Sequence, residues 1–353
     1  MSLTENKPNF FDMEEGDLQS YMVGLGKERY RAQQVFKWVY RENETCPEQM
    51  TNLSKTFRTE LPKLIRWSLP ELVTHHKSVD GTQKFLFRIA TGETMESVVI
   101  PSEDRLTLCV SSEVGCNMAC KFCFTAKQKL KRRLSAGEIV GQLYAVQAKL
   151  EPGQRISNIV FMGMGEPLDN SDAVFKSIRI MHSTWGFNLS RKKITVSTSG
   201  IVPEIHKVTE AGVRLAVSLN AVDDETRSKI MPINRRWPIA ELLEACKQHA
   251  LVTKEKVTLE YVLLKGITDS LDHARKLVKL TQDLPCKINI IPFNEHPNSG
   301  FLRPPERHIV KFQEELLKVG VHALRRKTMG RDIYAACGQL TSVDKNHPMS
   351  LDS

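Results

Sequence analysis

The segment Arg105–Cys123, RLTLCVSSEVGCNMACKFC, joins a short apolar stretch to a loop with three cysteines. Cys116, Cys120 and Cys123 follow the spacing C-x3-C-x2-C. Thiolates are soft ligands that suit zinc or iron–sulfur clusters. A structural zinc site needs four ligands, whereas a [4Fe–4S] cluster held by three cysteines leaves one iron open to a small molecule. The loop favours the cluster, and a zinc site with a distant fourth ligand is the alternative.

Short apolar stretches alternate with helical patterns from Arg105 onward. We expect strands at 105–111, 156–162, 193–198, 213–219, 257–264, 287–292 and 321–325, with helices near 136–150, 171–183, 203–211, 238–250, 270–282 and 305–319. The pair Ser135 and Glu138 has the spacing of a capping box that opens the first helix. This alternation is typical of a parallel sheet with right-handed crossovers. The predicted fold is α/β, an open, partial (β/α)6 barrel.

The remaining chain divides around this barrel. Residues 1–70 are expected to form a helical accessory domain, with one helix within 28–42 and another that begins near 53–54. Residues 71–100 alternate apolar and polar side chains around Asp80-Gly81, which predicts a β-hairpin extension, that is, a hairpin or small sheet. Residues 101–340 form the predicted core domain, and 341–353 a flexible tail.

Polar and glycine-rich motifs follow the predicted strands. They are Gly163-Met164-Gly165-Glu166-Pro167, Ser197-Thr198-Ser199-Gly200, Ser218-Leu219-Asn220, Asn294 and Gly330 to Cys337-Gly338. In barrels of this kind, the carboxyl ends of the strands carry the chemistry. The motifs and the cysteine loop are therefore expected to meet at one rim.

The chain of 353 residues has a formal net charge of +9, which fits a polyanionic partner or a basic but uninvolved surface. Two basic runs flank the expected site, namely Lys127, Lys129, Lys131, Arg132 and Arg133, and Arg325, Arg326, Lys327 and Arg331. Either run could bind phosphates or be a solvated face. The sequence shows neither a signal peptide nor an apolar stretch long enough to span a membrane. We expect a cytoplasmic protein whose cysteines are reduced, metal-bound or catalytic.

The cysteine spacing resembles that of the radical S-adenosylmethionine (SAM) superfamily, and Gly163–Pro167 looks like its motif for the SAM ammonium. Three further features narrow the resemblance to one family within this superfamily. They are Cys109 in LCVSSEVGC, Cys337 in GRDIYAACGQL and the segment MPINRR (231–236). Together with RAQQVFKWVY (31–40), these motifs make nearly the whole chain similar to the family that methylates adenine C2 in 23S rRNA, some members of which also modify tRNA. The resemblance implies that the helical domain 1–70 binds RNA.

The resemblance implies roles for individual residues. Cys337 matches the methyl carrier, Cys109 the resolving cysteine and Glu96 the proposed proton acceptor. The positions that match SAM contacts are Gly165, Glu166, Ser197, Ser218, Leu219, Asn220 and Asn294. Asn220 departs from the family, which usually has His there. From its residues alone, Cys109 resembles a buried structural cysteine and Glu96 a solvated strand residue.

The resemblance also implies a reaction that uses two SAM molecules. One SAM methylates Cys337, and the second yields a 5′-deoxyadenosyl radical that removes a hydrogen atom from this methyl group. The resulting methylene radical adds to adenine C2. Loss of the C2 proton and attack by Cys109 then release methyladenine and leave a Cys109–Cys337 disulfide for reduction. The electron for SAM cleavage is expected from a donor such as flavodoxin or ferredoxin.

Three alternatives stay open at this point. A related class methylates C8 of the same adenine, and typically has Ala where Pro167 stands here. A radical SAM enzyme that acts on a peptide or metabolite would not need Cys109 and Cys337. An iron–sulfur or zinc module that only binds RNA would need no SAM.

Overall fold

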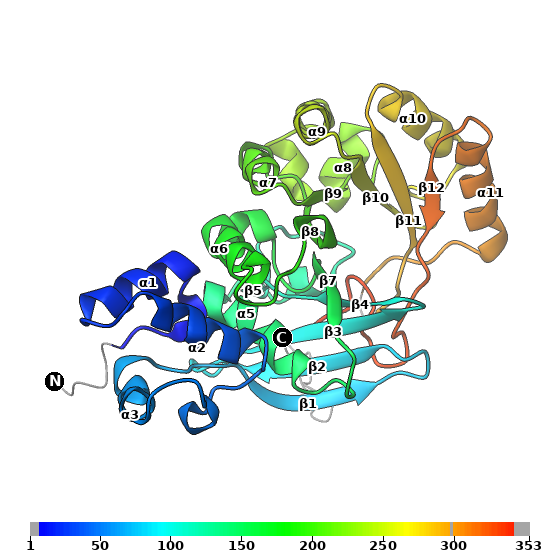
Figure 1. Cartoon of the computed structure of the whole chain (residues 1–353). Coiled ribbons are helices and arrows are strands. Elements are labelled where there is room, and N and C mark those ends of the chain that lie inside the picture. Colours follow the sequence, from blue (N-terminus) through cyan, green and yellow to red (C-terminus); the bar gives the residue numbers. More distant parts are fainter. Residues whose placement is uncertain (1–6, 297–298, 342–353) are drawn as a thin grey trace.

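The computed structural model describes residues 7–296 and 299–341, and its centre is a curved sheet of ten strands (Figure 1). The strands lie in the order β1-β2-β3-β4-β7-β8-β9-β10-β11-β12. Strands β1 to β4 pair antiparallel, and the pairs from β4 to β12 are parallel. Their bounds are β1 Glu71–Lys77, β2 Gln83–Arg88, β3 Thr94–Ser102, β4 Arg105–Cys109, β7 Ile156–Phe161, β8 Ile194–Thr198, β9 Arg214–Ser218, β10 Val257–Leu263, β11 Cys286–Pro292 and β12 Ala323–Arg325.

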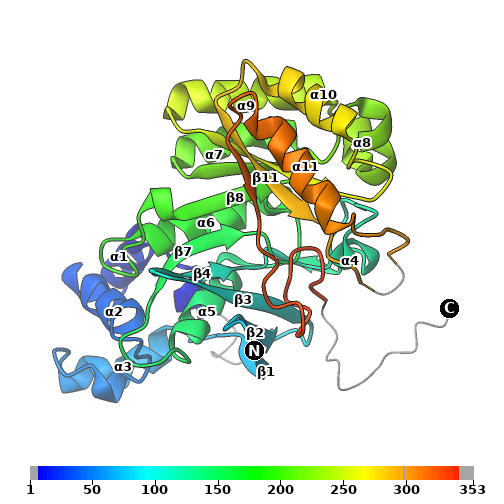
Figure 2. The ribbon, with the colours of Figure 1, turned by 90° about the vertical axis from the view of Figure 1, so that its right-hand side faces the viewer.

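Helices connect the parallel strands and cover the outer face of the sheet (Figures 1 and 2). They are α5 Ala136–Gln147, α6 Ser171–His182, α7 Ile205–Ala211, α8 Asp224–Ile230, α9 Ile239–Thr253, α10 Leu271–Thr281 and α11 Glu306–Leu317. Every strand and helix expected from Arg105 onward is present, with ends that shift by a few residues. The predicted partial (β/α)6 barrel is confirmed. Both faces of a parallel sheet of this kind are covered, and all seven residues of β10 are accordingly buried.

Residues 71–100 contain the expected hairpin, β1–β2, and a third strand, β3, as in the small sheet that was the other expectation. They form three antiparallel strands, and β3 continues into the core sheet by pairing with β4, with Val98 opposite Cys109. The extra strand arises because Thr94–Ser102 has a long buried run, MESVV, that needs a partner on each side. These strands are therefore part of the same sheet as the barrel.

The N-terminal region contains α1 Glu15–Gly24, α2 Tyr30–Tyr40 and α3 Lys55–Leu64. An aromatic cluster attaches it to the core: the Phe11 and Tyr144 rings are 5.1 Å apart, and those of Tyr40 and Phe187 4.8 Å apart. The helices expected within 28–42 and after 53–54 correspond to α2 and α3. The division into domains stays a prediction.

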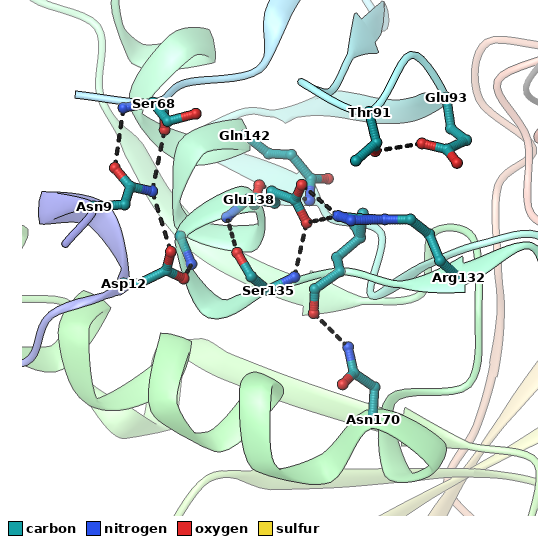
Figure 3. A network of polar contacts seen from close by, with 12 residues as sticks. Asn9, Asp12, Ser68, Thr91, Glu93, Arg132, Ser135, Glu138, Gln142 and Asn170 are labelled. Carbon is teal, nitrogen blue, oxygen red and sulfur yellow. Dashed lines mark hydrogen bonds and ion pairs between the residues drawn. The ribbon is translucent and has the colours of Figure 1, made fainter. Parts of the chain in front are cut away.

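Helix α5 has the expected capping box (Figure 3). The Ser135 hydroxyl accepts the Glu138 N–H, and the Glu138 carboxylate accepts the Ser135 N–H. A second cap comes from the N-terminal region, where the Asp12 carboxylate accepts the Gly137 N–H at 2.6 Å. Carboxylates satisfy the free N–H groups at a helix start and favour its dipole. The first turn of α5 thus ties the N-terminal region to the barrel.

Beyond β12, the chain turns back across the open side of the barrel toward β3 and β4 (Figure 2). The tip of the β1–β2 hairpin binds this segment, because Asp80 accepts the Gly330 N–H and Ser78 donates to Asp332. The tail predicted for 341–353 lies outside the described residues apart from Thr341. Among the helices of the described chain, none has the length and apolar character needed to cross a membrane.

Candidate active site

A pocket at the carboxyl ends of the parallel strands brings together most of the predicted site. Ten predicted residues line it, namely Cys116, Cys120, Cys123, Gly165, Glu166, Ser197, Ser218, Asn220, Asn294 and Cys337. The residues come from the carboxyl ends of β8 and β9, from the loops that follow β4, β7, β9 and β11, and from the C-terminal segment. Cys109, Glu96 and Leu219 lie outside the lining. The ends of parallel strands share one edge of the sheet, which explains why residues so distant in sequence converge.

The cysteine loop is fixed at both ends. The Lys121 N–H donates to the Ile230 carbonyl at 2.9 Å, and the Phe124 N–H to the Gly338 carbonyl at 2.8 Å. Gly115 precedes the loop with φ +79°, and a Cβ there would collide with the Lys129 backbone. The loop is therefore held between the end of α8 and the segment that carries Cys337.

The three thiols have the chemistry that an iron–sulfur cluster requires. Burial raises the pKa of all three thiols, so each is neutral until a metal binds it. Within the described part of the chain, no three Cys, His, Asp or Glu side chains converge tightly enough to bind one metal ion. In a cubane cluster each thiolate binds a different iron, so the thiols can line a wider pocket, as they do here.

Glu166 is a buried carboxylate that faces the same pocket. Its oxygens accept the N–H groups of Ser199 at 2.7 Å and Leu168 at 3.1 Å, and burial raises its pKa. In the described residues, it forms no ion pair with a lysine, arginine or histidine. Gly165 before it has φ +102°, and a Cβ there would meet the Glu113 side chain at 2.6 Å. A ligand ammonium would supply the cation that this carboxylate lacks.

A buried arginine organises the strand ends beside the cysteine loop. Arg227 is fully buried, and its guanidinium donates to the carbonyls of Ser199, Ser218 and Leu219 at 2.7 to 2.9 Å. A fourth hydrogen bond, also 2.9 Å, goes to Asn234 in the MPINRR segment. The segment thus acts through Arg227, which fixes the ends of β8 and β9. Arg227 also explains why Leu219 lies at the site without lining the pocket. The Leu219 carbonyl accepts from the guanidinium, while the Leu219 side chain lies in the core.

Asn220 has a conformation that favours asparagine. Its φ is +57°, in the left-handed region that Asn tolerates better than most residues. Its side-chain oxygen accepts the Val262 N–H at 2.9 Å, and its amide contacts the Met231 sulfur at 3.2 Å. The side chain therefore braces the pocket wall.

The segment with Cys337 is held over the pocket by several hydrogen bonds. Asn294 donates to the Cys337 carbonyl at 3.1 Å and accepts from the Thr328 hydroxyl. The Thr125 hydroxyl, next to the cysteine loop, donates to the Leu340 carbonyl. Cys337 is close enough to Cys123 and to Cys109 to raise the pKa of each. The proposed methyl carrier is therefore positioned between the cysteine loop and the end of β4.

Cys109 and Glu96 lie on one face of neighbouring strands. Cys109 is 5% exposed at the end of β4, and burial raises its pKa to about 12. Glu96 on β3 is buried, forms an ion pair with Lys84 at 3.0 Å and accepts the Thr341 N–H at 2.8 Å. Glu96 is not the solvated residue that the strand pattern alone suggests. It anchors the C-terminal segment a few residues beyond Cys337.

Three arginines of the two basic runs form ion pairs with carboxylates of the chain itself. Arg132 forms an ion pair with Glu138, and Arg133 with Asp169. Arg326 turns toward the barrel and pairs with Glu260. Charge runs in a sequence do not reveal such partners, and whether these arginines also bind phosphates stays a prediction. Lys129 and Lys131 remain exposed beside the loop.

Three residues of the site were not predicted, Arg227, Glu260 and the inward-facing Arg326. Arg227 lies four residues before the MPINRR segment (231–236), which was the nearest available signal. Glu260 interrupts the apolar strand VTLEYVL, where a charge indicates an inward-facing polar position.

Comparisons with known proteins agree with this geometry. Residues 110–278 match the radical SAM superfamily, and 8–66 match the N-terminal domain of ribosomal RNA large subunit methyltransferases. The chain is 64% identical to "Dual-specificity RNA methyltransferase RlmN" of Bdellovibrio bacteriovorus, over 99% of this chain and 87% of that protein. It is 50% identical to the protein of that name from Geotalea uraniireducens, over 92% and 94% of the two chains.

A solved structure gives the same result for the fold. A radical SAM methyltransferase from Sphaerobacter thermophilus superposes with a TM-score of 0.91 and 40% identity, over 95% of this chain and 100% of that one. The likeness therefore extends over the barrel, the antiparallel strands and the N-terminal helices together. The chain belongs to the RlmN family of SAM-dependent RNA methyltransferases, within the radical SAM superfamily.

Proposed function

We propose that this protein methylates C2 of a specific adenosine in 23S rRNA, and that tRNA is a second substrate. The observation that carries the proposal is the position of Cys337, in one pocket with the three loop thiols and next to the buried Cys109. An enzyme that only cleaves SAM would need neither of these two cysteines. The names of the relatives, dual-specificity RNA methyltransferases, support an RNA substrate.

Cys116, Cys120 and Cys123 would hold the [4Fe–4S] cluster, and the buried thiol set of the pocket fits that group. The bound cluster would supply the electron that cleaves SAM. Glu166 would bind the SAM ammonium, because it is a buried carboxylate that forms no ion pair within the described residues and accepts the N–H groups of Ser199 and Leu168. The wall residues Gly165, Ser197, Ser218, Asn220 and Asn294 would contact SAM, and Leu219 would contribute backbone only.

Cys337 would carry the methyl group and then be joined to adenine C2 through the methylene carbon. Cys109 would attack the Cys337 sulfur and release the product, an ordinary thiolate exchange. Glu96 would take up the C2 proton. Both oxygens of Glu96 have partners, Lys84 and the Thr341 N–H. To accept the C2 proton, Glu96 would therefore have to give up the hydrogen bond from Thr341 as the C-terminal segment moves.

The RNA would bind across the rim of the barrel and the N-terminal helices. Exposed Lys129 and Lys131 beside the cysteine loop would neutralise phosphates, the main source of affinity for nucleic acids. The target base must leave its stack to reach the pocket. A small redox protein such as flavodoxin or ferredoxin would supply electrons. The proposed RNA substrates favour the cytoplasm as the location of the reaction.

Mass spectrometry of nucleosides tests the proposal. The reconstituted enzyme is incubated with SAM, a reductant and either 23S rRNA or tRNA that lack the modification. We expect 2-methyladenosine in both RNAs and none with the Cys337→Ala variant. If 8-methyladenosine forms instead, the assignment to C2 is wrong, and if SAM is cleaved while RNA stays unmodified, RNA is not the substrate.

A further inference from the structure

Arg326 places a positive charge inside the barrel. It follows β12, and its N–H donates to the Ile290 carbonyl at 2.9 Å. Its guanidinium does not extend into solvent with the neighbouring arginines. Its Nη1 lies 3.3 Å from Glu260 Oε1 and 3.6 Å from the Met162 sulfur. The side chain is 27% exposed, so solvent reaches it only in part.

Glu260 fixes this guanidinium in position. Glu260 is 7% exposed in the middle of β10, and its second oxygen accepts the Ser197 hydroxyl at 3.2 Å. A buried carboxylate without a cation is costly, and the pair leaves Arg326 one well-defined location. Arg326 is thus a permanently charged group, anchored on the inner face of the sheet beside the pocket.

Met162 connects Arg326 to Cys109. Cys109 is paired with Val160 on β7, and Met162 is two residues further along that chain. The Met162 backbone provides a hydrogen bond to the Cys109 sulfur, while the Met162 side chain contacts Arg326. Arg326 and Cys109 therefore both contact Met162, although 217 positions separate them in the sequence.

The surroundings of Cys109 otherwise oppose its ionisation. Burial and then Cys337 raise the pKa of Cys109, Glu260 adds to the effect, and the Arg326 guanidinium opposes it. On β3, the only charged neighbour on this face is Glu96, which is already paired with Lys84. On β7 the neighbours, Val160 and Met162, carry no charge. Of the groups that act on Cys109 here, Arg326 is thus the cation that favours the thiolate.

We propose that Arg326, anchored by Glu260, is the positioning residue that makes the Cys109 thiolate available for release of the methylated base. The proposal rests on the two-cysteine route of the proposed function. In this step the thiolate electron pair forms the Cys109–Cys337 S–S bond. The bond between the Cys337 sulfur and the methylene carbon breaks, its electron pair passes to that carbon, and one proton converts the methylene to the methyl product.

Trapping of the covalent RNA adduct tests the proposal. Arg326→Gln and Arg326→Lys are reconstituted with cluster and incubated with SAM, reductant and RNA at several pH values between 7 and 9. The adduct is measured on a denaturing gel. An opposite charge within about 4–6 Å lowers a pKa by 1–3. We therefore expect release in Arg326→Gln to slow at least about tenfold at pH 7, so that adduct accumulates and then disappears as the pH rises.

Control variants separate the possible results. Arg326→Lys keeps the charge and should accumulate little adduct, whereas Cys109→Ala should accumulate it at every pH. Arg275→Gln, which removes a surface arginine paired with Glu315, should behave like the unaltered enzyme. Intact-protein mass shows whether each variant still methylates Cys337.

Each remaining outcome overturns one specific statement. If adduct in Arg326→Gln persists equally at pH 7 and 9, or if Arg326→Lys accumulates as much as Arg326→Gln, the charge of Arg326 does not act on Cys109. If Arg326→Gln methylates Cys337 but forms no adduct at any pH while Cys109→Ala does, the proposal for Arg326 is likewise wrong. If Cys109→Ala forms no adduct either, the two-cysteine route itself fails.

Discussion

Replacement of Arg227 by Met should destabilise the strand ends that support the pocket. The change removes four hydrogen bonds and leaves the buried carbonyls of Ser199, Ser218 and Leu219 without this donor. An unsatisfied buried polar group costs about 1–3 kcal/mol. The four losses are not additive, and we expect a total of about 3–5 kcal/mol, the range for breaking a buried charged interaction.

The effect should be visible in both stability and ligand binding. At roughly 2 °C per kcal/mol for a chain of this size, Tm should fall by about 6–10 °C in differential scanning calorimetry. SAM affinity should fall at least about tenfold, or 1.4 kcal/mol, because Ser218 and the end of β8 lose their support. The exposed Arg235, replaced by Met, is the matched control. If Arg227→Met binds SAM normally and its Tm is unchanged, the role assigned to Arg227 is wrong.

Three further predictions concern the cluster, a buried carboxylate and the RNA surface. Cys120→Ala should lose its iron and its ultraviolet–visible cluster absorption, and full iron content would refute the ligand assignment. Burial raises the pKa of Glu113 to about 8, so the folded protein keeps a proton that the unfolded chain releases above about pH 4.5. The contribution of this protonation to the free energy of unfolding is present at low pH and is lost as the pH rises through 8. Glu113→Gln should therefore gain stability over the unaltered enzyme between pH 5 and 9, by up to a few kcal/mol, and a pH-independent difference in Tm would contradict this. Replacing Lys129 and Lys131 by Ala should flatten the salt dependence of RNA binding by roughly one to two in log–log slope, with Lys247→Ala as an unaffected control.

The sequence predicts the barrel and most of the pocket because both follow from local patterns. Apolar strands and amphipathic helices alternate with a regular period, and parallel strands bring their carboxyl ends to one edge. Cys116, Glu166 and Asn294 could therefore be placed together without a structure. Their convergence depends on topology alone and not on the direction of a particular side chain.

The remainder depends on side-chain direction and register, which the sequence does not contain. Arg326 lies in a basic run, yet it alone of that run turns inward to Glu260. Glu96 has its ion pair with Lys84 because β2 and β3 pair in a register that buries both. The alternation in 71–100 left a hairpin and a small sheet equally open, and the pairing of β3 with β4, which joins these strands to the barrel, depends on a partner distant from the hairpin.

The most direct test of the account is the fate of RNA in the Cys109→Ala enzyme. If Cys109 is the resolving thiolate, the variant should still methylate Cys337 and then accumulate RNA covalently attached to it. The adduct would be a shifted band on a denaturing gel that ribonuclease removes, and it should be absent in Cys337→Ala and in the double variant. If Cys109 is only a core residue, Cys109→Ala should lose about 1 kcal/mol of stability and nothing else. A folded Cys109→Ala enzyme that forms methyladenosine at the normal rate, with no trapped RNA, would contradict the two-cysteine mechanism.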